Sequence, residues 1–87
     1  METRQDIVEI AYVLISCDLG YEAAIIGKLE KISEIKEVRG TLGVFDIFVK
    51  IQADSKDLIE ETITKIRKIQ NIRGTNTLTA IITQGGR

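Results

Sequence analysis

The sequence has no histidine and only one cysteine, and these shortages exclude several kinds of functional site. A single cysteine forms no internal disulfide, and without a C-x-x-C pair the chain contains neither a zinc ribbon nor a thioredoxin-type redox centre. No G-x-S-x-G motif, phosphate-binding glycine loop or dinucleotide fingerprint is present. Cys17 has no histidine to activate it, so we interpret it as a small buried apolar residue at a strand end. The sequence therefore predicts no catalytic residue, no metal and no cofactor.

The chain is also poor in aromatic residues, and its charge is almost balanced, with twelve basic and thirteen acidic side chains. A net charge of −1 provides no attraction toward nucleic acid or an anionic membrane. RNA-binding sheets need exposed aromatics and a basic surface, and only Tyr12 and Phe48 are available here. No apolar run approaches the roughly 20 residues of a membrane span, and METRQDIVEI lacks the apolar core of a signal peptide. We therefore expect a cytoplasmic protein with no direct contact to nucleic acid or membrane.

One phrase occurs twice: IKEVRGT at 35–41 returns thirty-four residues later as IQNIRGT at 69–75. The same shift aligns Ile25 with Ile59 and Leu29 with Ile63 without a gap. A period of this length also suggests a helical repeat, but each half begins with a β-rich segment, EIAYVLISC or VFDIFVKIQ. Two strand-helix-strand halves predict an α+β domain with the ferredoxin-like βαββαβ fold, in which two helices cover one face of a four-stranded antiparallel sheet.

Apolar periodicity and turn signals give boundaries for these elements. We expect strands at 9–17, 36–42, 45–52 and 72–83, with turns at Asp18-Leu19-Gly20 and, tightly, at Gly43. A first helix over 21–32 has the apolar face Ala24, Ile25, Leu29 and Ile32. A second helix, capped by Asp54 or Ser55, has the stripe Ile59, Ile63, Ile66 and Ile69. The single domain comprises 1–87, with its core at about 9–83 and a flexible tail at 84–87.

The sheet face away from the helices should be polar in a monomer, but here it is apolar. In the first strand, Ile10, Tyr12 and Leu14 alternate with a second apolar set, Ala11, Val13, Ile15 and Cys17. Phe48 lies opposite the main apolar row of the third strand, and the last strand is apolar on both faces. A domain of this size also buries only about 60–65% of its unfolded surface. We therefore predict a dimer in which two sheets pack face to face about a two-fold axis.

From AYVLISCDLG to KIQNIRGTNTLTAII, roughly residues 9–83, the chain resembles the effector-binding domain of the Lrp/AsnC family of transcriptional regulators, also called the RAM domain. One feature behind this resemblance is G-x-[aromatic]-D at the hairpin between the second and third strands, here Gly43-Val44-Phe45-Asp46. The other is a threonine-rich last strand after R-G-T, here Thr75-Asn76-Thr77-Leu78. Full-length family members carry a helix-turn-helix before this domain, for which the roughly eight residues here are too few. We therefore expect a stand-alone effector domain without DNA-binding activity.

The resemblance implies a function as well as a fold. It implies sheet-to-sheet dimers that form an α/β barrel, rings of dimers such as octamers, and small effectors, usually amino acids, bound between dimers. The expected role is non-enzymatic sensing and oligomerisation linked to transcriptional regulation of metabolism, through assembly or by joining full-length Lrp/AsnC regulators. At the hairpin, Gly43 permits close backbone approach and Asp46 offers a negative charge to an ammonium group. The candidate ligand-binding residues are Leu42, Gly43, Val44, Asp46, Thr75, Asn76 and Thr77.

Other interpretations of the same residues stay open. Gly43 can be simply a turn glycine, and Asp46 a carboxylate that holds the hairpin through local hydrogen bonds. Threonine is common in strands by propensity alone. Arg39 and Arg73 are related by the repeat, which favours a structural or interface role. The alternative functions are a small dimeric α/β-barrel enzyme of the monooxygenase or isomerase type, and an assembly scaffold without a ligand.

Overall fold

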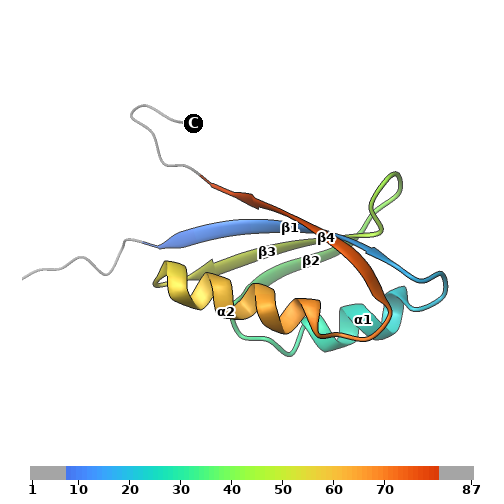
Figure 1. Ribbon diagram of the computed structural model, residues 1–87, viewed down its shortest axis with the longest axis horizontal. Coiled ribbons are helices and arrows are strands. Elements are labelled where there is room, and N and C mark those ends of the chain that lie inside the picture. Colours follow the sequence, from blue (N-terminus) through green and yellow to red (C-terminus); the bar gives the residue numbers. More distant parts are fainter. Residues whose placement is uncertain (1–7, 81–87) are drawn as a thin grey trace, which may run out of the picture.

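The computed structural model describes residues 8–80, which form a four-stranded sheet and two helices (Figure 1). The elements in chain order are β1 (Glu9–Cys17), α1 (Glu22–Leu29), β2 (Ile35–Gly40), β3 (Ile47–Ala53), α2 (Lys56–Arg67) and β4 (Ile72–Thr79). The strands lie in the order β2-β3-β1-β4, every neighbouring pair is antiparallel, and both helices lie on the same side of the sheet. This arrangement confirms the predicted ferredoxin-like fold. The repeat shift also aligns the first residues of the two helices, Glu22 and Lys56.

The core lies between the sheet and the helices. The fully buried side chains of the two central strands project from one face: Ala11, Val13, Ile15, Ile47, Val49 and Ile51. The register accounts for this, because Val13 lies opposite Val49 and side chains alternate along each strand. Cys17 ends the β1 row and is buried, as predicted. Since full burial of an aliphatic side chain contributes about 1.5–3 kcal/mol, these two strands are a principal source of stability.

α2 begins at a capping residue and buries one aliphatic stripe. Ser55 is the N-cap, and its Oγ accepts a hydrogen bond from the backbone N–H of Leu58 at 3.2 Å, so Ser55 rather than Asp54 has the predicted capping role. The stripe packs as expected from the helix at Ile59, Ile63 and Ile66, while the partly buried Ile69 lies beyond the helix end. Its spacings of three and four residues place these side chains on one face.

α1 is shorter than the predicted 21–32 segment. After Leu29 the chain makes three-residue hydrogen bonds, from Lys31 N–H to the Lys28 carbonyl and from Ile32 N–H to the Leu29 carbonyl. Bonds of this kind tighten the last turn of a helix without extending it. Ile25 and Leu29 are buried as predicted, but the inclusion of Ala24 in the apolar face is wrong. Its side chain is exposed because it shares a helix side with Lys28, one turn later.

The connection between β2 and β3 departs most from the predicted boundaries. A tight turn at Gly43 is wrong, because β2 ends at Gly40 and β3 begins at Ile47, which leaves a loop over 41–46. Thr41 closes the base of this loop: its N–H donates to the Asp46 carbonyl at 2.9 Å and its hydroxyl to the Phe45 carbonyl at 2.7 Å. Gly43 has φ +130°, a conformation that other residues rarely adopt. The two hydrogen bonds donated by Thr41 thus close the loop, at a place where a tight hairpin would continue the backbone hydrogen bonds between β2 and β3.

β4 is an edge strand that pairs within the described sheet only with β1. A register shift between Ser16 and Cys17 leaves Arg73 as the extra residue of a bulge in β4. The last part of the predicted strand, 81–83, lies outside the described residues, as does the predicted tail at 84–87. Within residues 8–80, no helix is both long and apolar enough to cross a membrane.

The sheet face opposite the helices is not covered by any helix or strand of residues 8–80 (Figure 1). In register, Tyr12 lies beside Leu78, and Leu14 lies beside Phe48. The rings of Tyr12 and Phe48 stack with their centroids 5.8 Å apart, and Leu78 remains 53% exposed. Both faces of β1 are therefore apolar, as the sequence predicts.

Candidate functional site

Asp46, the central residue of the predicted ligand site, lies immediately before β3 and is bound to the end of β1. Its Oδ2 accepts a hydrogen bond from the backbone N–H of Cys17 at 2.9 Å, and its own N–H donates to the Ile15 carbonyl at 2.8 Å. The carboxylate therefore has a structural task, but it acts across the sheet rather than within the hairpin. Among residues 8–80 only Oδ2 is engaged, so Oδ1 keeps its capacity to accept a hydrogen bond.

A second polar cluster lies at the same end of the sheet and is absent from the predicted site: Asp18, Asn71 and Arg73. Asn71 Nδ2 donates to Asp18 Oδ2 at 3.0 Å, and the Asp18 N–H donates to the Asn71 carbonyl at 2.9 Å. Asn71 has φ +74°, in the left-handed region that asparagine tolerates better than most residues. Arg73 Nε lies 3.9 Å from Asp18 Oδ1. The sequence signal for this cluster is an asparagine shortly after a helix, since asparagine often ends helices in this conformation.

Negative charge is concentrated around Cys17 at this end of the sheet. Burial raises the pKa of the Cys17 thiol, and the charges of Asp46, Glu22 and Asp18 raise it further. A raised pKa keeps the thiol protonated at neutral pH, which is typical of an unreactive structural cysteine. Within the described residues, no three acidic or cysteine side chains converge closely enough to hold a metal ion.

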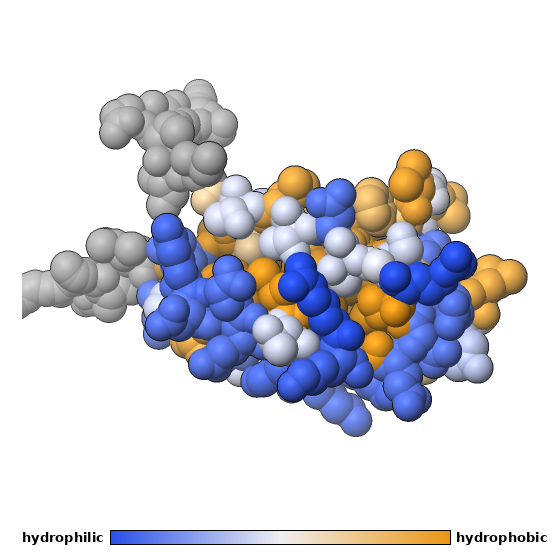
Figure 2. All heavy atoms as spheres, in the orientation of Figure 1, coloured by the Kyte–Doolittle hydropathy of each residue, from blue (hydrophilic) through white to orange (hydrophobic). Residues whose placement is uncertain are grey.

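The loop over 41–46 projects from the sheet on the side away from the helices (Figure 1). Its tip carries two exposed aliphatic side chains, Leu42 at 102% and Val44 at 86% exposure. Figure 2 shows this apolar tip at the upper right, in contrast to the largely polar surface over the helices. The loop tip and the open sheet face thus lie on the same side of the domain, and exposed apolar side chains of this kind often mark contact with another molecule.

β4 divides its three candidate residues between the two faces of the sheet. Thr75 and Thr77 lie opposite buried residues of β1 and face the helices, whereas Asn76 lies opposite Leu14 on the open side. Thr75 Oγ1 accepts a hydrogen bond from Arg67 Nε at 3.2 Å. Thr77 Oγ1 is buried and finds no partner among residues 8–80. One protomer therefore brings Asn76 to the same side as the loop but places the two threonines behind the sheet, and the ligand role of all three stays a prediction.

The repeat-related arginines have different partners. Arg39 Nε lies 3.0 Å from Glu37 Oε2 within β2, whereas Arg73 pairs with Asp18 across the β1–β4 end of the sheet. Both arginine side chains remain largely exposed. Exposed pairs of this kind contribute at most about 1 kcal/mol each, so neither is a main source of the domain's stability.

Fold and site together define a small ferredoxin-like α+β domain with an apolar patch on its open sheet face and an acidic sheet end. The family profile of the Lrp/AsnC ligand binding domain matches residues 10–83, and the chain belongs to this family. The match confirms the resemblance seen in the sequence, and it includes the loop over 41–46 and all of β4.

Three similar proteins illustrate where this domain occurs. The HTH-type transcriptional regulator FL11 of Pyrococcus furiosus is 30% identical over 69 residues, 79% of this chain and 46% of FL11. The chain thus spans about half the length of that relative. A homocitrate synthase of Saccharolobus islandicus is 32% identical over 73 residues, 83% of this chain and 15% of the enzyme. The crystal structure of hypothetical protein PHS023 from Pyrococcus horikoshii has a TM-score of 0.80 and 33% identity, covering 88% of this chain and 93% of that chain.

Proposed function

We propose that this domain is a non-enzymatic sensor, which binds a small amino-acid effector at a subunit interface and responds by changing its assembly. The observation that carries the proposal is the apolar patch on the uncovered sheet face of a member of the Lrp/AsnC ligand-binding family. A sheet with one uncovered apolar face favours a second protein layer, and a second copy of the chain is the simplest one.

The position of the apolar residues supports self-association. Tyr12, Leu14, Phe48 and Leu78 form a patch that crosses β3, β1 and β4. A two-fold axis near β1 would place this patch on the same patch of a sister subunit, since an isologous interface uses one surface twice. The loop tip projects toward the same side and would extend the contact. Association of such dimers into rings, octamers included, is the further step that family membership suggests.

The chemistry of the acidic sheet end supports an amino acid as the effector. Its ammonium group would donate to Asp46 Oδ1, which is not used inside residues 8–80. Its carboxylate would accept from the Asn76 side-chain amide or from loop N–H groups near Gly43, where no Cβ obstructs approach. Leu42 and Val44 would surround the aliphatic part. Thr75 and Thr77 face the helices, and the buried Thr77 hydroxyl has no hydrogen-bond partner within residues 8–80.

The relatives support sensing rather than catalysis. One is named as a transcriptional regulator and another as a homocitrate synthase, and the shared segment is 46% of the first and 15% of the second. A segment common to proteins with different outputs is better explained as a sensing or assembly module than as the part that binds DNA or catalyses a reaction. The output of this chain would then arise from its own assembly or from mixed oligomers with full-length Lrp/AsnC regulators.

Sedimentation of a face variant tests the assembly part. Phe48→Glu puts a carboxylate on the open face opposite Arg39 of β2, which can pair with it in a folded protomer. We expect the wild-type protein to sediment as a dimer or larger species at micromolar concentration and Phe48→Glu as a single protomer. Thr64→Glu, on the exposed side of α2, is the matched control and should behave as wild type. A wild-type protein that stays a lone protomer would contradict the proposal.

Calorimetric titration with the standard amino acids tests the ligand part. Asp46→Asn keeps an oxygen that can accept from the Cys17 N–H, but it removes the charge that the ammonium group needs. We expect at least one amino acid to bind the wild-type assembly and to bind this variant at least about tenfold more weakly, with assembly unchanged. If no amino acid binds intact oligomers, the function is reduced to assembly alone.

A further inference from the structure

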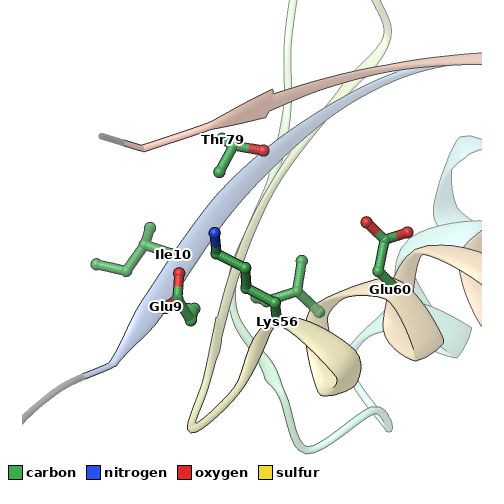
Figure 3. Close-up of a pocket in the computed structure, with 6 residues that line it drawn as sticks. Glu9, Ile10, Lys56, Glu60 and Thr79 are labelled. Carbon is green, nitrogen blue, oxygen red and sulfur yellow. The ribbon is translucent and has the colours of Figure 1, made fainter. Parts of the chain in front are cut away.

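A cavity at the opposite end of β1 from Cys17 has no part in the function proposed above. It lies between the start of β1, the first turns of α2 and the end of β4, and its volume is about 250 Å³ (Figure 3). Its lining residues are Glu9, Ile10, Lys56, Ile59, Glu60 and Thr79. Sites for drug-sized ligands measure about 300–1,000 Å³, so this cavity is suited to a smaller molecule.

Charged groups of both signs, supplied by different elements, line this cavity. Glu9 of β1 and Glu60 of α2 contribute carboxylates, Lys56 of α2 an ammonium and Thr79 of β4 a hydroxyl. Figure 3 shows the Lys56 amino group extended from α2 toward β1, between Glu9 and Thr79. None of the ion pairs formed within residues 8–80 involves Lys56. Its three donors are therefore available to a bound molecule.

Ile59 supplies the apolar wall of the cavity and, at 6% exposure, is held in place by the fold. Ile10 belongs to the cavity edge, because its side chain points away from Lys56 toward the open sheet face (Figure 3). A short aliphatic chain can lie against Ile59 while its polar ends reach the charged groups. The cavity thus combines a fixed apolar side chain with polar groups from three elements, a composition suited to a small molecule.

We infer that this cavity binds a small basic amino acid. Two carboxylates and one ammonium give the lining a charge of −1, which a ligand with one carboxylate and two cationic amino groups balances. The ligand carboxylate would accept from Lys56 Nζ and the Thr79 hydroxyl, and its amino groups would donate to Glu9 and Glu60. A diamine would leave Lys56 facing another cation, and a neutral amino acid would leave one carboxylate unpaired.

Three compounds differing by one group test this assignment by calorimetry: L-ornithine, putrescine, which lacks its carboxylate, and L-norvaline, which lacks its side-chain amino group. We expect ornithine to bind and each of the other two to bind at least about fivefold more weakly. Amide NMR signals of Glu9, Thr79 and 56–60 should shift on titration, and those of 41–46 should not. Putrescine binding as tightly as ornithine, or no ornithine binding to the folded protein, would overturn the inference.

Variants separate this site from the acidic sheet end. Lys56→Gln and Glu9→Gln should each weaken ornithine binding about fivefold, because each removes one charged contact. Glu61→Gln and Lys65→Gln, exposed on α2 and outside the lining, are matched controls that should bind as wild type. If ornithine binding is lost in Asp46→Asn and unchanged in Lys56→Gln, the ligand belongs to the sheet end and the inference is wrong. Failure at this cavity leaves the proposed function untouched, since its test is amino-acid binding that depends on Asp46.

Discussion

Replacing Asp46 by alanine should destabilise the domain through one hydrogen bond. In the folded chain, Oδ2 accepts from the Cys17 N–H at 2.9 Å in a partly buried position. Hydrogen bonds to a charged group contribute about 1.5–3 kcal/mol, and the buried N–H would lose its partner. The Asp46 backbone bonds to Thr41 and Ile15 do not depend on the side chain and should persist. We therefore expect Asp46→Ala to lower the free energy of unfolding by about 2 kcal/mol.

Asp46→Asn is the matched variant, because it keeps an acceptor oxygen and loses the charge. A neutral acceptor forms a weaker bond than a charged one, so we expect Asp46→Asn to lower the free energy of unfolding by about 1 kcal/mol. For a domain of this size, 1 kcal/mol corresponds to about 4–8 °C in Tm, so alanine should lower Tm by about 8–16 °C and asparagine by roughly half as much or less.

Thermal and urea unfolding, followed by circular dichroism at one fixed protein concentration, measure both variants. The fixed concentration matters because self-association makes Tm depend on the amount of protein. Equal Tm values for the alanine and asparagine variants would show that the charge, not the hydrogen bond, stabilises this junction. An alanine variant as stable as wild type would refute the proposed role of the bond altogether.

Five further substitutions have expected effects on unfolding. Ser55→Ala removes the cap of α2 and should cost about 1 kcal/mol in urea unfolding, whereas Asp54→Ala should cost less. Gly43→Ala should destabilise the domain by about 1–3 kcal/mol, because φ is +130° at this position. Gly27→Ala should stabilise it by up to about 1 kcal/mol, because alanine favours the helical conformation of α1. A higher Tm for Gly43→Ala than for Gly27→Ala would refute the loop geometry. The raised pKa of Cys17 means that the folded state holds the thiol proton more tightly than the unfolded state. The protonated thiol therefore contributes fully to the free energy of unfolding below the usual pKa of 9.0, and this contribution is lost as the pH rises above that value. Cys17→Ala should therefore reduce the fall in urea stability between pH 8.5 and 10.5, and identical pH profiles would contradict the shift.

The fold could be predicted because its signals are local and repeated. β1 matches its predicted bounds, since an apolar run on both faces ends at a turn whose Gly20 has φ +91°. Ser55 indicates where α2 begins, because serine commonly caps the N-terminus of a helix. The helix and strand ends were less predictable, because the three-residue bonds after Leu29 and the closing bonds of Thr41 change a boundary without changing hydrophobic periodicity.

The geometry of the candidate site depends on strand register, which hydrophobic periodicity does not report. Alternation alone puts Thr75 and Thr77 on one face and Asn76 on the other, but only pairing with β1 shows which face the helices cover. In the same way, the bond between Asp46 and the Cys17 N–H exists because β3 begins opposite the end of β1. A sequence motif can therefore identify these residues as candidates without showing that they divide between the two sides of the sheet.

The repeated sequence segment occupies different structural positions in the two halves of the domain. The segment R-G-T occurs at 39–41 and again at 73–75. β2 ends within the first copy, at Gly40, whereas the second copy lies entirely inside β4. The difference comes from topology. After the edge strand β2 the chain has to reverse direction to form the neighbouring strand β3, whereas β4 stays paired with β1 as far as Thr79. The loop after the first copy carries the exposed Leu42 and Val44 and ends at Asp46, whose carboxylate is bound to β1. The loop that follows the first copy of R-G-T therefore has no counterpart after the second copy within residues 8–80.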